Sequence, residues 1–296
     1  MRNGTTDAAV CADIGGSFIR VAAVRGAEVA GIATIPTPAH DWDAFAGGLA
    51  GLLAGHAPGA PLGMSVPGVL NGQGGVAAAN VPCLAGRRVA AELSALLDRP
   101  VALANDADCF ALAEASTGAG RGHRVVLGVI LGSGVGGGLV VGGSLVPGAG
   151  EWGHGPLVRS GPLADIPCGC GQNGCVDAAG SARGLERLHA VLHGAAADSR
   201  AVVAGWEQGD GRCRATVAAW LDVVAGPLAF AVNLTAATVV PVGGGLGSAP
   251  ALVAALDGAV RARCIRPPPG PLVVPAAHGG TGGLIGAAVL ARAAPP

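Results

Sequence analysis

Lysine and tyrosine are both absent from this sequence of 296 residues, and all 18 of its basic residues are arginine. Without lysine the chain cannot contain a P-loop, which needs a Gly-Lys-Ser/Thr step, or the strand lysine of an ordinary protein kinase. It also cannot form a Schiff base through a lysine amine. Any phosphate that the protein binds must therefore be held by backbone amides, metal ions or arginine.

Charged residues are scarce too, at 12% of the sequence, and the formal net charge is −1. Proteins that bind nucleic acids or membrane surfaces usually carry a basic patch, so we expect neither partner. The uncharged segment 125–150 resembles a membrane span in hydropathy, but its ten glycines and one proline oppose a helix. The N-terminal residues lack the pattern of a signal peptide. These features predict a cytoplasmic protein of about two domains that acts on a small molecule.

Glycine, in contrast, is abundant, with 53 residues, and three glycine turns each follow an apolar β-type run. Glycine lets backbone N–H groups approach an anion closely, which suits a phosphate or polyphosphate. In the first turn, Asp13 could also hold a hydrated Mg²⁺, although Asp-Gly-Gly is common in plain hairpins. The candidate nucleotide-binding residues are Asp13, Gly15, Gly16, Ser17, Gly132, Ser133, Gly134, Gly243, Gly244 and Gly245.

The second glycine turn is predicted to span residues 132–138, between strands over 125–131 and 139–141. Its Gly132-x-Gly134-x-x-Gly137 spacing matches the dinucleotide-binding fingerprint, which must be followed by a helix. The next residues have a β period and end at another glycine pair, so a nicotinamide oxidoreductase is disfavoured. A tight turn without a ligand remains the alternative.

Three cysteines lie close together in the sequence CGCGQNGC, namely Cys168, Cys170 and Cys175, and His154 precedes them. Three thiolates and one imidazole form the ligand set of a structural zinc site. A disulfide pair or three unligated thiols are the alternatives. The five other cysteines are scattered among apolar neighbours, which is typical of a reducing compartment.

Asn105 and Asp106 follow the buried strand predicted over 100–104 and precede a helix predicted over 107–116. Both residue types favour the N-cap position, which is one interpretation. The other is functional, because the carboxyl end of a strand in an α/β sheet faces the usual ligand crevice. Further strands are predicted over 10–13, 18–24, 62–66, 239–242 and 272–275, and further helices over 42–54, 88–97, 182–192, 214–237, 249–261 and 282–293.

Taken in order, these motifs resemble the ROK family (repressors, open reading frames, kinases) of bacterial sugar kinases. The resemblance covers nearly the whole chain, and the segments 78–82, 105–112 and 168–172 are most similar to bacterial N-acetylglucosamine kinases. It implies an actin-like, ribonuclease-H-like α/β fold with ATP and sugar in a cleft between two lobes. The implied parts are a small lobe over 1–106, a larger lobe with the zinc loop over 107–281, and a C-terminal helix over 282–296 that packs on the small lobe. The resemblance also implies a homodimer.

The same resemblance implies roles for individual residues. Asp106 would be the general base on the sugar hydroxyl, and the glycine turns would hold ATP and Mg²⁺. The structural zinc ion would fix the loop that carries Glu151 and His154. The implied sugar contacts are Gly68, Asn80, Asn105, Asp106, Glu151, His154 and Asp177.

Two residues depart from the family pattern. Asp177 stands where a glutamate is usual, so its carboxylate is one methylene shorter and its sugar contact is in doubt. Pro241 replaces an aliphatic residue, and a proline is awkward in a central strand because it donates no ladder hydrogen bond.

The resulting expectation is an ATP-dependent kinase for the 6-hydroxyl of N-acetylglucosamine or a related hexose. A glucokinase, a fructokinase or an N-acetylmannosamine kinase are alternatives within the family. A sugar-sensing protein without catalysis is a further alternative, and it would lack the base.

Overall fold

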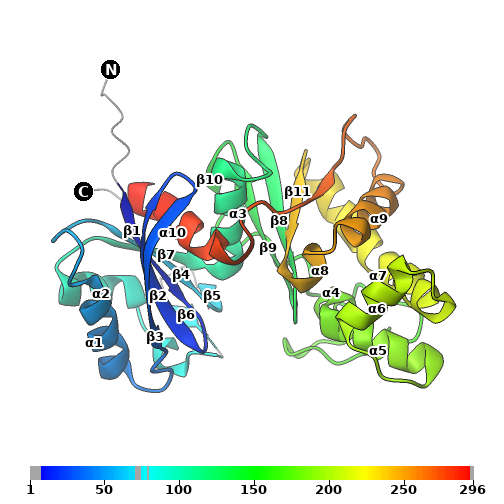
Figure 1. The fold of residues 1–296 in the computed structure, drawn as a ribbon, viewed down its shortest axis with the longest axis horizontal. Helices are drawn as coiled ribbons and strands as arrows, with labels where there is room; N and C mark the ends of the chain where they lie inside the picture. The colour runs from blue at the N-terminus through cyan, green and yellow to red at the C-terminus, as the bar shows by residue number, and fades with distance from the viewer. Residues whose placement is uncertain (1–7, 71–74, 79, 294–296) are drawn as a thin grey trace. The chain divides into compact units, whose positions relative to one another are not determined.

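The computed structural model describes residues 8–70, 75–78 and 80–293 (Figure 1). Ala79, which belongs to the segment expected around the sugar site, and the ends 1–7 and 294–296 of the expected lobes lie outside the described residues. The chain forms two compact units, one of residues 1–117 with 280–296 and one of residues 118–279. The boundary expected after residue 106 differs from this division by one helix.

The first unit is built on a five-stranded sheet with the order β3-β2-β1-β4-β7. β1 pairs antiparallel with β2 and parallel with β4, and β4 pairs parallel with β7. Val10, Ala12 and Ile14 alternate with Cys11, so the two faces of β1 pack into different clusters. The strands are β1 (Ala9–Ile14), β2 (Phe18–Arg25), β3 (Glu28–Pro36), β4 (Leu62–Val66) and β7 (Val101–Asn105).

Helices cover both faces of this sheet. One face packs against α1 (Trp42–Leu53) and α2 (Val89–Leu97), and the other packs against α10 (Gly282–Ala293). A small hairpin of β5 (Val69–Leu70) and β6 (Val76–Ala77) and a short turn of 3₁₀-helix (Pro82–Leu84) follow β4.

The last helix, α10, lies unusually close to its neighbours because the contact residues are glycines. A Cβ added at Gly63 of β4 would lie 1.7 Å from Ala287 O, and one added at Gly286 would lie 1.9 Å from Cys109 O. Cys109 belongs to α3 (Asp106–Thr117), so α3 and α10 pack together within the first unit. This contact explains why α3 falls in the first unit and not in the second, where the sequence analysis placed it.

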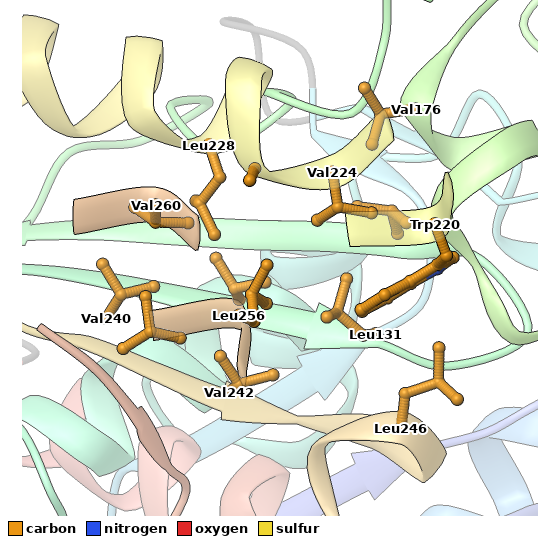
Figure 2. Packing of buried hydrophobic residues seen from close by; sticks show 14 of the residues in the cluster. Leu131, Val176, Trp220, Val224, Leu228, Val240, Val242, Leu246, Leu256 and Val260 are labelled. Atoms are coloured by element: carbon orange, nitrogen blue, oxygen red, sulfur yellow. The ribbon is translucent and has the colours of Figure 1, made fainter. Parts of the chain in front are cut away.

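The second unit has a sheet with the order β10-β9-β8-β11-β12. Trp220, Val224 and Leu228 of α7 pack over this sheet among the side chains of β11 and α9 (Figure 2). The strands are β8 (Val125–Leu131), β9 (Val135–Val141), β10 (Ser144–Leu145), β11 (Val240–Gly243) and β12 (Val273–Pro275). The helices are α4 (Val176–Gly180), α5 (Ala182–His193), α6 (Ser199–Glu207), α7 (Gly211–Thr235), α8 (Gly244–Gly247) and α9 (Pro250–Arg261).

α7 is long and apolar enough to cross a membrane by length and composition, and it is the one such helix in the described part of the chain. Half of its apolar window is buried inside the unit. The fully buried Trp220 also donates from Nε1 to Gly180 O at 2.8 Å. These contacts are those of a core helix.

Pro241 lies inside β11, between β8 and β12, although a proline disfavours a central strand. Val240 N donates to Leu272 O of the β12 side, and Val242 O accepts from Ala276 N. Successive residues of a strand in the middle of a parallel sheet bond to the neighbouring strands in turn. Val240 and Val242 bond on the β12 side, so the position where Pro241 lacks an N–H faces β8. The β8 ladder is interrupted there: one bridge lies at Val239, and pairing resumes at Val242.

Candidate functional site

In the first unit, the predicted site residues lie at the carboxyl edge of the three parallel strands. Asp13 of β1 is level with Ser65 of β4, and Val66 of β4 is level with Asn105 of β7. The carboxyl ends of parallel strands open into the ligand crevice of α/β sheets. The fold therefore brings Asp13, the turn after β4 and the Asn105-Asp106 pair to one edge.

A cavity of about 410 Å³ lies at the first glycine turn, lined by Asp13, Gly15, Gly16, Ser17, Phe18, Arg20 and Thr34. Arg20 pairs with the Asp13 carboxylate and also donates to Gly280 O at 3.2 Å. The sequence analysis did not single out Arg20. The hairpin register could have identified it, since residues flanking a tight turn face each other and Asp13 opposes Arg20. The Arg20 guanidinium thus places a positive charge beside the first glycine turn, in a chain that has no lysine.

Gly68 and Asn80 are placed by the hairpin between β4 and α2. Gly68 has a φ of 96°, and a Cβ there would lie 2.1 Å from Ala77 O, so only glycine lets β5 and β6 close. Beyond the hairpin, Asn80 reaches the first glycine turn: a Cβ added at Gly16 would lie 3.3 Å from Asn80 Cβ. Asn80 is exposed and adjacent to that turn.

Asn105 and Asp106 take different positions at the start of α3. Asn105 Oδ1 accepts from Asp108 N at 2.7 Å, which is the N-cap interaction that one interpretation predicts. Asp106 is the first residue of the helix, and its Oδ1 accepts from Ala107 N at 2.9 Å. Its side chain is exposed, and the helix N-terminus favours its negative charge. Asp106 thus presents its carboxylate at the strand edge.

In the second unit, the other two glycine turns touch each other. β8 and β11 are parallel, with Gly243 level with Ile130. Gly244 has a φ of 82°, and a Cβ there would lie 2.5 Å from the carbonyl carbon of Leu131. A cavity of about 660 Å³ opens beside both turns, lined by Gly132, Ser133, Arg183, Glu186, Arg200, Gly245 and Ser248 among others. The charged members come from α5 and α6, and the sequence analysis did not predict them.

The second glycine turn is shorter than predicted, because Gly136, Gly137 and Gly138 belong to β9. Close packing explains these strand glycines. A Cβ added at Gly137 would lie 2.9 Å from Gly128 O and 3.0 Å from Gly150 O. The segment that follows Gly150 is then held on β9, where Trp152 Nε1 donates to Gly136 O at 3.2 Å. Gly137 therefore serves packing, and the turn itself consists of residues 132–134.

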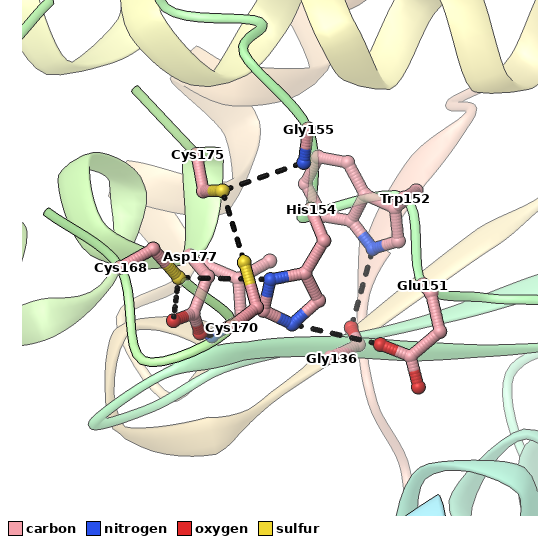
Figure 3. A network of polar contacts seen from close by, with 10 residues as sticks. Gly136, Glu151, Trp152, His154, Gly155, Cys168, Cys170, Cys175 and Asp177 are labelled. Atoms are coloured by element: carbon pink, nitrogen blue, oxygen red, sulfur yellow. Dashed lines mark hydrogen bonds and ion pairs between the residues drawn. The ribbon is translucent and has the colours of Figure 1, made fainter. Parts of the chain in front are cut away.

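Figure 3 shows the cysteine cluster beside this segment. One ligand atom from each of His154, Cys168, Cys170 and Cys175 lies within 4.8 Å of the other three. Cys170 Sγ and Cys175 Sγ are 3.6 Å apart, and Cys168 Sγ is 3.7 Å from His154 Nδ1. The other ring nitrogen of His154, Nε2, is 3.6 Å from Glu151 Oε2. One imidazole therefore faces the sulfurs with one nitrogen and an acid with the other.

The thiols of this cluster differ in acidity. Burial raises the pKa of Cys168 to about 12, whereas a hydrogen bond from the backbone of Gln172 lowers the pKa of Cys170 to about 7. Cys170 is exposed and Cys168 is buried. A thiol of lowered pKa next to two others is suited to capture a soft cation, whose charge would favour ionisation of the rest.

Asp177 lies next to the cluster on α4. Its Oδ1 accepts from Val135 N at 2.7 Å, and its Oδ2 is 3.4 Å from Cys168 Sγ. Both oxygens are thus engaged within the second unit. The sugar contact expected of Asp177 stays a prediction.

Comparison with known proteins is consistent across the chain. An N-acetyl-D-glucosamine kinase of Escherichia coli O9:H4 is 35% identical over 94% of this chain and 97% of that protein. An N-acetylgalactosamine kinase of a Shewanella species is 37% identical over 86% of this chain and 87% of that protein. The crystal structure of a ROK hexokinase from Thermus thermophilus superposes with a TM-score of 0.83, at 32% identity over 96% of this chain and 98% of that one. This likeness confirms the expected actin-like α/β fold. The ROK family model matches residues 9–294, and the chain belongs to the ROK family.

Proposed function

We propose that this protein is an ATP-dependent sugar kinase that phosphorylates the 6-hydroxyl of N-acetylglucosamine or a related hexose. The observation that carries the proposal is the edge of the first sheet, where the exposed carboxylate of Asp106 shares the strand ends with Asp13 and its glycine turn. The kinase names of the similar proteins support the same activity.

In the proposed reaction, Asp106 accepts the proton of the sugar hydroxyl as the oxygen attacks the terminal phosphorus of ATP, and the bond from that phosphorus to the bridging oxygen breaks, so that ADP leaves. Phosphoryl transfer depends mainly on positioning and on stabilisation of charge. The amides of the turns at Gly15–Ser17, Gly132–Gly134 and Gly243–Gly245 hold the phosphates. Mg²⁺, which Asp13 would help to hold, supplies further positive charge, and Arg20 keeps the Asp13 carboxylate in place.

Gly68, Asn80, Asn105, Glu151 and His154 are the proposed sugar-binding residues. Asn80 and Asn105 supply amide groups, and Glu151 supplies a carboxylate that can accept hydrogen bonds from hydroxyls. Asn105 also caps α3, so it orients the helix that begins with Asp106. The hydrogen bond that holds the Asn105 side chain therefore also holds the first turn of the helix that carries the base.

We also propose that His154, Cys168, Cys170 and Cys175 hold one structural Zn²⁺. The donor set fits, since three thiols and one imidazole are zinc ligands and the four atoms lie within 4.8 Å of one another, close enough to surround one ion. His154 would bind through Nδ1, because that nitrogen faces Cys168, which leaves Nε2, 3.6 Å from Glu151 Oε2, for the sugar side. The cluster thereby fixes the segment that carries the acid.

The preferred sugar is the finer part of the proposal. The similar kinases are named for N-acetylglucosamine and for N-acetylgalactosamine, and a similar solved structure is a hexokinase. Glucose, fructose and N-acetylmannosamine remain alternative substrates. A cytoplasmic homodimer without nucleic acid or membrane partners completes the proposal.

An ADP-release assay with N-acetylglucosamine, N-acetylgalactosamine, N-acetylmannosamine, glucose and fructose tests it. We expect the highest kcat/KM for N-acetylglucosamine. A tenfold preference for another sugar would replace the substrate and leave the kinase in place. No turnover of any sugar, together with measurable sugar binding, would favour the non-catalytic sensor.

A further inference from the structure

Asp177 contacts three segments of the second unit through three of its atoms. Its backbone N–H donates to Gly153 O at 2.9 Å, in the segment that carries Glu151 and His154. Its Oδ1 accepts from Val135 N at 2.7 Å, and its Oδ2 is 3.4 Å from Cys168 Sγ. A zinc-bound Cys168 would be a thiolate and could not donate to Oδ2. The backbone N–H and Oδ1 of Asp177 therefore carry the connection between the sugar-side segment and the start of β9.

The contact of Asp177 with β9 lies directly beside the glycine turn. Val135 is the residue directly after the turn at 132–134, which is closed internally by a bond from Gly132 N to Gly134 O at 2.9 Å. A Cβ added at Gly134 would lie 2.8 Å from Asp177 Oδ1, so a side chain at this position would push the carboxylate aside. The carboxylate accepts the first amide of β9 and packs against the turn.

We propose that Asp177 is a positioning residue that fixes the glycine turn at 132–134 to the segment that carries Glu151 and His154, and thereby orients the turn for the phosphates of ATP. The inference rests on the proposed kinase function for its last step only. It gives a physical reason for aspartate at this position: a glutamate would carry its carboxylate about 1.5 Å further along the side chain. If it extended in the same direction, that carboxylate would lie closer to the turn at Gly134 than the Asp177 carboxylate does.

Amide hydrogen exchange at Val135 tests the contact without any assay of activity. In Asp177→Ala the Val135 amide loses a charge-assisted hydrogen bond, so we expect its exchange to become about tenfold faster or more. Asp177→Asn keeps an oxygen acceptor, and its Val135 amide should exchange within about threefold of wild type. Asp165→Ala, an exposed acid of the same loop, is the matched control and should leave Val135 unchanged.

Gly134→Ala disturbs the same contact through a change in the glycine turn, and it replaces no residue of the loop that contains Cys168. The added Cβ would displace the Asp177 carboxylate, so Val135 should again exchange faster. This variant decides the question if Asp177→Ala does not fold. Unchanged exchange at Val135 in a folded Asp177→Ala or Gly134→Ala protein would overturn the proposal.

Kinetic constants separate the positioning role from a sugar contact. We expect Asp177→Ala to raise the KM for ATP by about tenfold, with the KM for the sugar within about twofold of wild type, and Asp177→Asn to restore the ATP value. A rise confined to the sugar KM would contradict the role and support the sugar contact. If the wild-type protein has no kinase activity, the proposed function fails, while hydrogen exchange still decides whether Asp177 fixes the turn.

Discussion

At the scale of single residues, Asp106 makes the most direct prediction. Its carboxylate is exposed at the start of α3, and the proposed mechanism needs it as a base. Asp106→Asn should keep the fold and sugar affinity but lower kcat by about 10²-fold or more, as expected for a lost general base. Asp98→Asn is the control: Asp98 has a φ of 47°, which asparagine tolerates, and it should retain full activity. Steady-state kinetics and equilibrium sugar binding measure both, and wild-type turnover in Asp106→Asn would assign the base elsewhere.

His189 makes a second prediction at this scale. It is buried, and its Nδ1 bonds to Thr216 Oγ1 at 2.9 Å; His193 Nε2 bonds to the same hydroxyl at 3.1 Å. Burial lowers the pKa of His189, and the neighbouring His193 and Arg212 lower it further, while Asp210 opposes them. The folded protein therefore resists a proton that the unfolded chain accepts.

The sign of the pH effect follows from that difference. Above the unfolded pKa of about 6.5 the histidine is neutral in both states, and stability is unaffected. As the pH falls below that value, only the unfolded state gains the proton, so the folded state loses stability. Urea midpoints between pH 7.5 and 5.5 should fall less steeply in His189→Gln than in wild type. Parallel pH profiles for the two proteins would contradict this role of His189.

At the scale of elements, the cysteine cluster predicts one zinc ion per chain. Elemental analysis of protein purified without added metal should give about one equivalent, and a chelator should lower the melting temperature because bound metal stabilises the fold. Cys168→Ser should lose most of the metal. Cys264→Ser changes a cysteine outside the cluster and should keep it. A metal-free wild-type protein whose Cys168→Ser variant melts at the same temperature would exclude the site.

The elements that sequence predicted well are those whose signal is local. The apolar run of β8 has the expected bounds 125–131, and α10 has the expected bounds 282–293. β3 was not predicted, because most of its residues are exposed and show no regular apolar alternation. β9 begins earlier than predicted, since its glycines pack against Gly150, a neighbour that no local pattern reveals.

The same distinction holds within the site. Motif order predicted the candidate residues, and the strand register places Asp13 and Asn105 at one edge of the sheet. The partner of Asp177 was not predictable, because Val135 lies 42 residues away and its free amide depends on the turn geometry. Arg183 and Arg200 were not predicted for a similar reason. They belong to helices that only the tertiary fold brings beside the glycine turns.

At the scale of the whole molecule, the chain leaves its first unit after residue 117 and returns to it at residue 280. The stability of the first unit thus depends on α10, which comes from the far end of the sequence and packs on β4 and α3 through glycines. Two mid-helix glycines allow a matched test. Gly286 of α10 faces Cys109 O, whereas a Cβ at Gly258 of α9 would meet nothing within 4 Å.

Gly286→Ala should therefore destabilise the protein by about 1–3 kcal/mol, because the added methyl overpacks the contact between α10 and α3. Gly258→Ala should stabilise it by up to about 1 kcal/mol, because alanine is the better helix former and the space is open. Hydrogen exchange resolved by region distinguishes the units: Gly286→Ala should speed exchange in β1, β4 and α3 and leave β8 and β11 unchanged. Equal loss of protection in both units would mean that they unfold together, and that α10 stabilises the whole chain and not the first unit alone.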